Sequence, residues 1–295
     1  MKQRKFLKTA TPYLFIMPWI IGFLVFTIGP LILSLIMSFF EWPLTTAPTF
    51  RGLGNYIDMF TKDKQFWKSL IISLKYAAIF VPLNMIIALF LAMLITQPVK
   101  GVKVFRTIFY IPAVISGVAV SIIWGWILNG DYGVLNYLLS LLGIKGPKWL
   151  VDPAWALLAV IIASAFGVGT MMLIFYTDIK NIPVDVYEAA SIDGAGRWAK
   201  IKYVTLPGIK PTIIILLLMN VGNVLNAGFE IQYLLGNGLV QDVSQTIDIY
   251  VLKWGISQGD YAIGTAAGIF KSVVSIILIF IANRIAKHNG EEQLF

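Results

Sequence analysis

Long apolar runs separated by short polar segments dominate the chain. The first run, Thr9 to Phe40, extends over 32 positions without a charged residue. A helix needs about 20 apolar residues to cross the hydrocarbon core of a bilayer. The later runs are of similar length and cover roughly residues 70–97, 107–130, 155–177, 212–229 and 261–283. The pattern therefore predicts six membrane-spanning helices, and the fold class is an all-α polytopic membrane protein.

Proline and polar residues predict local features of these runs. Pro12, Pro18 and Pro30 lie in a first run that is longer than one straight span requires, so a kinked first helix is expected. The segments between the runs are polar, and GNYIDMF in the first of them predicts a short surface helix. Gly264 and Gly268 in the last run have the spacing of small residues that lets another helix pack closely, and a helix of a partner subunit is one candidate.

Composition agrees with a membrane protein and excludes several kinds of site. The chain is 58% hydrophobic and 13% charged, with a mean hydropathy of +0.80. The net charge is +8, but the basic residues lie between the spans and form no basic face interleaved with aromatic residues. Nucleic-acid binding is therefore not expected. No cysteine is present and the one histidine, His288, lies near the C-terminus. We therefore expect no catalytic residue and no metal site.

The distribution of basic residues predicts the orientation of the chain. If the N-terminus is cytoplasmic, the inner segments hold 14 Lys and Arg residues and the outer loops hold 7. Positively charged loops favour the cytoplasmic side of a membrane. Both termini and the polar segment around residue 190 are accordingly predicted to be cytoplasmic.

The segment Tyr187 to Pro211 is polar and basic, although it lies between two long apolar runs. Pro183 and Asp185 are typical of a helix N-terminus. Gly194 and Gly196 permit a sharp change of direction, because glycine tolerates positive φ. The segment is thus predicted to form two short helices joined by a glycine turn, and composition alone fits an ordinary cytoplasmic hairpin.

The spacing within this segment resembles a known motif. Glu188-Ala189-Ala190, then Gly194, Val204 and Leu206-Pro207 at fixed offsets, resembles the EAA loop of binding-protein-dependent ABC importers, with Val204 where the usual pattern has Ile. FRTIFYIPAVISGVAVSIIWGWILN, PKWLVDPAWA and most of the C-terminal third resemble carbohydrate-uptake permeases of the maltose and glycerol-phosphate type, and the ending resembles the LplB-type branch.

The resemblance implies the type I permease fold of ABC importers and a set of partners. These are a second homologous permease, two ATP-binding subunits, an extracytoplasmic sugar-binding protein and the lipid bilayer of the bacterial plasma membrane. The chain has no G-x-x-x-x-G-K-[ST] loop, so ATP and magnesium would be bound by the partner ATPase. The residues expected to couple the chain to that ATPase are Glu188, Ala189, Ala190, Asp193, Gly194, Gly196 and Arg197.

The resemblance also places substrate contacts in the spans before and after the EAA loop. The residues expected along this substrate path are Ser164, Gly167, Thr170, Asn220, Asn223, Asn226 and Lys271. Hydroxyls and carboxamides suit the hydroxyl groups of a sugar, although the same residues also join helices within bundles.

Lys271 is unusual, because a lysine near the middle of a span costs roughly 3 kcal/mol unless it has a partner or meets water. Glu230 at the end of the fifth span is a candidate partner in a structural ion pair. Attraction of an acidic sugar is the alternative.

Residues 12–286 are therefore interpreted as one six-span permease domain with a coupling loop at 181–210, between cytoplasmic tails at 1–11 and 287–295. The chain is expected to be the permease subunit of an ATP-driven, binding-protein-dependent importer of sugars, with oligosaccharides as the expected substrates. Three alternatives are an ABC permease for glycerol-3-phosphate or another small solute, a secondary transporter, and a membrane-embedded enzyme. The last would need acids or histidines at membrane depth, which the predicted spans lack.

Overall fold

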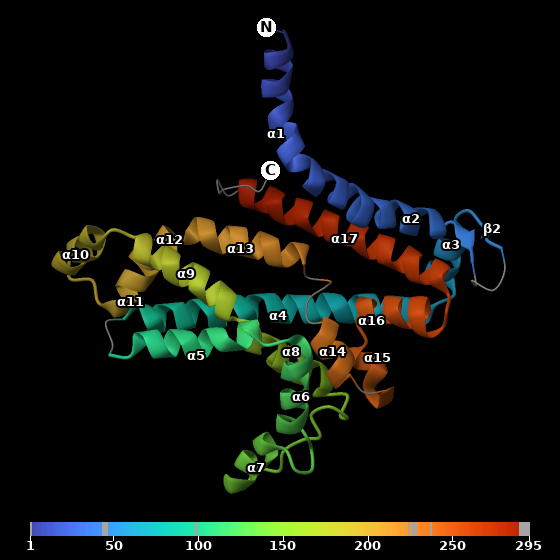
Figure 1. Cartoon of the computed structure of the whole chain (residues 1–295). Coiled ribbons are helices and arrows are strands. Elements are labelled where there is room, and N and C mark those ends of the chain that lie inside the picture. The colour runs from blue at the N-terminus through green and yellow to red at the C-terminus, as the bar shows by residue number, and fades with distance from the viewer. Residues whose placement is uncertain are drawn as a thin grey trace. The chain divides into compact units, whose positions relative to one another are not determined.

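The computed structural model is built mainly of helices and describes residues 2–42, 47–97, 100–223, 225, 229–236 and 238–288, without the side chains of residues 2–12 and 288. Figure 1 labels the helices and strands along the chain. The chain divides into two compact units. Unit 1 consists of Met1–Lys64 and Val251–Phe270, and unit 2 of Gln65–Tyr250 and Lys271–Phe295.

Unit 1 contains the first apolar run and a small polar cap. Its elements are α1 (Lys2–Phe23), η1 (Leu24–Ile28), α2 (Gly29–Met37), β1 (Phe40–Glu41), β2 (Thr49–Phe50), α3 (Gly54–Thr61), η5 (Lys253–Ser257) and the first part of α17 (Tyr261–His288). The helix α3 covers the GNYIDMF segment, which confirms the predicted short helix.

The first run departs from regular α-helix at one place. The segment η1 is a π-helical turn that ends directly before α2, whose first residues include Pro30. Proline lacks the N–H group for the bond to the residue four positions earlier, and its ring crowds that carbonyl. Pro12 and Pro18 lie inside α1, so the irregularity occurs only at the third proline.

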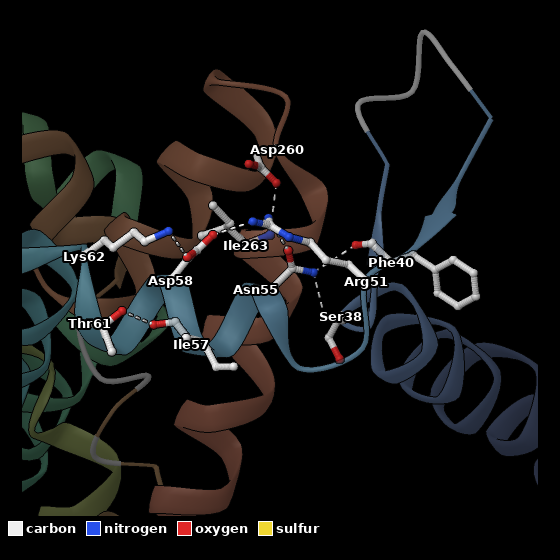
Figure 2. A network of polar contacts seen from close by, with 10 residues as sticks. All are labelled: Ser38, Phe40, Arg51, Asn55, Ile57, Asp58, Thr61, Lys62, Asp260 and Ile263. Atoms are coloured by element: carbon white, nitrogen blue, oxygen red, sulfur yellow. Dashed lines mark hydrogen bonds and ion pairs between the residues drawn. The ribbon is translucent and has the colours of Figure 1, made fainter.

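A network of polar contacts connects helix α3 with the segment that follows α2 (Figure 2). The Asn55 amide donates hydrogen bonds of 2.9 Å to the backbone oxygens of Ser38 and Phe40, and its oxygen accepts one of 3.1 Å from Arg51. Asp58 forms ion pairs with Arg51 and with Lys62, the latter at 2.6 Å. The hydrogen bond from Lys62 lowers the pKa of the Asp58 carboxyl most, against a smaller opposing effect of burial, so Asp58 is ionised at neutral pH.

Substitution of Asn55 by alanine is expected to destabilise unit 1. Asn55 is 1% exposed, so its removal leaves two carbonyl oxygens without these donors in a buried place, at a cost of about 1–3 kcal/mol. The melting temperature of the purified protein in detergent should fall by a few degrees. Thr61→Ala is the matched control, because the Thr61 hydroxyl bonds to Ile57 on the exposed side of the same helix. An equal shift in both variants would contradict the role of the network.

The first glycine of the small-residue pair has its close neighbour within the chain. A Cβ atom at Gly264 would lie 2.7 Å from the Cα and 2.9 Å from the backbone nitrogen of Gly255. The same construction at Gly268 meets no atom within 4 Å. Gly264 therefore allows α17 to approach η5, and a partner subunit is not needed to explain it.

Gly264→Ala is accordingly expected to force the backbones of η5 and α17 apart. Overpacking of this kind costs about 1–3 kcal/mol. The measurable result is a lower melting temperature and a lower yield of protein extracted from the membrane. Gly268→Ala, one helical turn away, should change neither quantity, and a similar loss in that variant would show that the effect is not due to the Gly255 contact.

Unit 2 holds most of the helices. They are α4 (Lys64–Thr96), α5 (Val102–Val114), α6 (Gly117–Ile127), α7 (Val134–Leu141), α8 (Ala156–Ser164), η2 (Ala165–Gly167), α9 (Gly169–Asn181), α10 (Val184–Ile192), α11 (Arg197–Lys200), η3 (Ile201–Thr205), α12 (Leu206–Gly208), α13 (Lys210–Gly222), α14 (Phe229–Leu235), η4 (Gly238–Val240), α15 (Gln241–Ser244), α16 (Ile247–Leu252) and the rest of α17. The first residue of α4 belongs to unit 1, as do the last residues of α16.

Three of the expected spans are single helices and three are broken. Tyr13–Met37, Lys64–Thr96 and Tyr261–Lys287 are each long and apolar enough to cross a membrane. The other three consist of helix pairs bent by 103° between α5 and α6, by 50° after Gly167 and by 64° after Gly208. Within the described residues the chain thus has up to six spans, as the apolar runs predict, and the third, fourth and fifth are each broken by a bend.

Each bend has a local cause in the sequence. Between α5 and α6, Ile115 and Ser116 are extended, and the Ser116 hydroxyl caps the new helix by accepting from the Ala119 N–H. Gly167 and Gly169 flank the second bend, and Pro207, Gly208 and Pro211 surround the third. Glycine and proline weaken helix continuity, so apolar composition alone does not keep these spans straight.

The fifth span is also shorter than the apolar run suggested. The helix α13 ends at Gly222 with Asn223 at its C-terminal cap, whereas the expected span continued to Phe229. Thirteen residues of α-helix extend about 20 Å, which is less than the hydrocarbon thickness of a bilayer.

Candidate functional site

The segment predicted to couple the chain to an ATPase forms a helix–turn–helix. The helix α10 ends in a turn in which the Gly194 N–H donates to Ser191 O at 3.1 Å and the Ala195 N–H donates to Ala190 O at 2.9 Å. Gly194 has φ +77°, the left-handed conformation that this type of helix ending requires. The glycine turn is therefore confirmed at Gly194. Gly196, in contrast, has φ −70° and caps α11, so the expectation of positive φ is wrong there.

Side chains hold the two arms of this loop together. The Tyr187 hydroxyl lies 3.0 Å from the Thr205 hydroxyl, and Lys200 donates to the Ser191 hydroxyl at 2.6 Å. Tyr187 and Ser191 lie on α10, whereas Lys200 and Thr205 lie on the following helical segment. These two contacts join the arm formed by α10 to the arm formed by α11 and η3.

The outer surface of the loop presents an acid beside large apolar side chains. Glu188 and Arg197 are exposed. Ile192 and Trp198 are 86% and 83% exposed. Figure 1 shows α10 and α11 beyond the end of α9 and far from α7. Large exposed apolar side chains next to charged ones are typical of protein contact surfaces.

The structure separates the residues expected along the substrate path. Ser164 is buried in α8 near the Tyr76 hydroxyl of α4, whereas Thr170 is exposed on α9. The Asn220 and Asn223 amides donate to Leu216 O and Met219 O of their own helix, at 2.7 and 3.2 Å. Asn226 lies outside the described residues.

Gly167 and Gly169 have different surroundings. A Cβ atom at Gly167 would meet nothing within 4 Å, so close packing does not require that glycine. At Gly169 a Cβ atom would lie 2.7 Å from Phe109 O and 2.8 Å from Tyr110 Cα. Gly169 therefore lets α9 approach α5, a role that the sequence interpretation did not assign.

Lys271 is ion-paired with Asp248 of α16, and both side chains are about one-sixth exposed. The suggested partner, Glu230, lies elsewhere: a Cβ atom at Gly117 would overlap its carboxylate. Asp248 and Lys271 are 23 positions apart and on different helices, so only the fold brings them together.

Thr170 belongs to an open groove that polar side chains line. The groove has a volume of about 460 Å³ and is formed by α5, α9 and α13. Its lining residues are Tyr110, Thr170, Leu173, Ile174, Thr177, Asp178, Asn181 and Thr212. Five of its six polar residues were missed. The signal was present on α9, where positions 170, 174, 177, 178 and 181 share one helical face.

The comparisons with known proteins identify the family. The sequence model of the family "Binding-protein-dependent transport system inner membrane component" matches residues 84–290. The chain belongs to this family. It is therefore an integral inner membrane transport component and not an enzyme. No group of three or more His, Cys, Asp or Glu side chains able to hold a metal occurs among the residues that the structure describes.

Two relatives are similar in sequence to this chain along nearly its whole length. The chain is 33% identical over 303 residues to the polygalacturonan/rhamnogalacturonan transport system permease protein YteP of Bacillus subtilis, covering 99% of this chain and 91% of YteP. It is 34% identical over 290 residues to protein LplB of the same organism, covering 96% and 90%. The resemblance to the LplB-type branch is confirmed.

Solved structures confirm the fold. A bacterial ABC transporter involved in the import of the acidic polysaccharide alginate aligns with a TM-score of 0.87 at 29% identity, over 98% of this chain and 99% of the other. The same kind of transporter in complex with an alginate pentasaccharide-bound periplasmic protein aligns with a TM-score of 0.86, over 98% of each chain. The expected fold of an ABC importer permease is therefore correct.

Proposed function

We propose that the chain is one permease subunit of an ATP-driven importer that takes up oligosaccharides delivered by an extracytoplasmic binding protein. The observation that carries this proposal is the helix–turn–helix α10–α11 on a chain that belongs to a family of binding-protein-dependent transport components. The substrate class rests on the similarity to YteP and to the alginate importer, together with the hydroxyl and amide groups of the groove.

The coupling loop would dock on an ATP-binding subunit. Glu188 and Arg197 supply charges for that contact, and Ile192 and Trp198 supply buried area once a partner covers them. Ala189, Ala190, Asp193, Gly194 and Gly196 shape the helix ending and its turn. ATP and magnesium would be bound by that partner.

The loop is placed to pass a movement on to the substrate path. One arm, α10, begins three residues after the end of α9, and the other continues through η3 and α12 to α13. The helices α9 and α13 both line the groove. A shift of the docked loop would therefore change the width of the groove, which is the kind of coupling that alternating access needs.

The assembly that we propose contains a second homologous permease, two ATP-binding subunits and the binding protein. Both termini and the coupling loop would be cytoplasmic, as the excess of Lys and Arg on that side supports. Residues 12–286 would form the permease domain. Ser164, Gly167, Thr170, Asn220, Asn223 and Asn226 remain candidates for the substrate path.

Extraction in mild detergent followed by an ATPase assay in liposomes tests the proposal. The chain is expected to co-purify with another permease and an ATPase, and one oligosaccharide with its binding protein should stimulate hydrolysis. Purification of the chain without an ATPase would overturn the proposal and favour a secondary transporter. Stimulation by glycerol-3-phosphate rather than by a sugar would retain the importer and reject the substrate class.

A further inference from the structure

The groove between α5, α9 and α13 has one charged side chain in its lining. Asp178 of α9 is that residue, and the other polar groups are hydroxyls and an amide. The volume of about 460 Å³ lies within the range of small-molecule sites. Leu173 and Ile174 complete the wall, so the groove offers both apolar surface and hydrogen-bonding groups.

The cations of the neighbouring helices are not part of this lining. Arg106 of α5 lies over the Tyr176 ring, 4.1 Å from its centroid, and hydrogen-bonds to the Tyr176 hydroxyl. Lys180 and Lys210 lie on the helices that form the groove, but their side chains do not line it. Among the ion pairs formed by the described residues, none involves Asp178. Its carboxylate is therefore available to a molecule in the groove.

A carboxylate distinguishes between neutral and acidic sugars. An ionised carboxylate only accepts hydrogen bonds, so it binds the hydroxyl donors of a neutral sugar. A uronate residue brings a second negative charge, and like charges at short distance repel. Lys271, the lysine near the middle of the last span, is already paired with Asp248, so its charge is balanced within the chain.

We propose that this groove is the inner part of the substrate path and that Asp178 makes it select uncharged oligosaccharides over uronate-containing ones. The inference rests on the proposed function as a sugar importer and deepens it by naming the substrate class. It separates this chain from two proteins to which it is similar, the transporter of the acidic polysaccharide alginate and the polygalacturonan/rhamnogalacturonan permease YteP.

The chain contains no cysteine, so a thiol placed in the groove is the single reactive thiol of this chain, and its labelling is read from the separated subunit. Thr177→Cys would be introduced and the assembled importer placed in lipid nanodiscs, where both faces are accessible. Rates of alkylation by cationic and anionic maleimides of similar size are then compared. Adding Asp178→Asn is expected to lower the cation-to-anion rate ratio about five-fold. A unit negative charge roughly 8 Å away in water both attracts the cationic reagent and repels the anionic one, and the two effects multiply. Asp131→Asn is the control, because Asp131 lies in the segment before α7 and does not line the groove, so the ratio should stay unchanged.

Two results of the alkylation experiment would overturn the inference. A ratio that Asp178→Asn does not change would show that the carboxylate does not act on the groove. A thiol that reacts in the isolated chain but not in the assembled importer would show that another subunit covers the groove. Slower alkylation by both reagents in the presence of a neutral galacto-oligosaccharide is expected, and unchanged rates would argue against sugar binding there.

Uptake by cells tests the selectivity itself. Galacto-oligosaccharides and oligogalacturonates of equal length are compared in the wild type and in Asp178→Asn, so that the preference of the binding protein cancels. The ratio of uronate uptake to neutral-sugar uptake should rise at least about three-fold in the variant, because the Asp178 charge that repels the uronate carboxylate is gone. An equal loss of both sugars would indicate a purely structural role. If the wild type hydrolyses ATP only with a non-sugar solute, the proposed function fails, whereas the alkylation result still decides whether Asp178 charges the groove.

Discussion

Glu188→Lys is expected to abolish uptake and substrate-stimulated ATP hydrolysis while the protein remains in the membrane. Glu188 is exposed on α10, so the substitution removes no contact from the core. Reversing the charge of Glu188 would bring like charges together at the proposed docking surface. Loss of one partner of a buried interfacial charge pair costs about 2 kcal/mol or more. That value corresponds to docking weakened by a factor of about thirty. Co-purification of the ATPase and uptake of labelled sugar measure the two expected losses.

Two control variants separate docking from other effects of Glu188. Glu188→Gln removes the charge without reversing it and should give an intermediate loss. Asp131→Lys makes a similar reversal in the loop that precedes α7 and should leave ATPase binding intact. Normal transport by Glu188→Lys would reject the assignment of α10–α11 as a coupling loop.

Local sequence determined the form of this loop, which is why it was predictable. The helix ending depends on residues close together in sequence, because its hydrogen bonds join Gly194 to Ser191 and Ala195 to Ala190, at most five positions apart. Pro183 caps α10 and Asp185 lies in its first turn, as their residue types indicated. The number of spans was equally accessible, because it depends only on the lengths of the apolar runs.

Features that depend on contacts between distant segments were not predictable in the same way. The bend between α5 and α6 follows from a serine cap inside an apolar run, which hydropathy does not detect. The groove requires Tyr110, Asp178 and Thr212, which come from three separate helices. Glu230 was a candidate partner of Lys271, whereas the partner is Asp248, because sequence position cannot show which acid lies beside the lysine in the fold.

Loss of one partner of the Lys271–Asp248 pair is expected to have the second large effect. Lys271→Met leaves the Asp248 carboxylate about one-sixth exposed and without its ion pair. Breaking a buried ion pair in this way costs about 3–5 kcal/mol. The variant should give a much lower yield of folded protein and a lower melting temperature. Lys75→Met is the control, because Lys75 is exposed near the start of α4.

The double variant Lys271→Met with Asp248→Asn decides between the two roles considered for the lysine. If the pair is structural, removing both charges restores most of the lost yield and stability, because no unpaired charge remains. Neutral-sugar uptake should then return as well. If Lys271 instead attracts an acidic substrate, the double variant is stable but loses uptake of uronate-containing sugars alone. That second outcome would also contradict the selectivity proposed for Asp178, because both residues would then act on the same substrates in opposite directions.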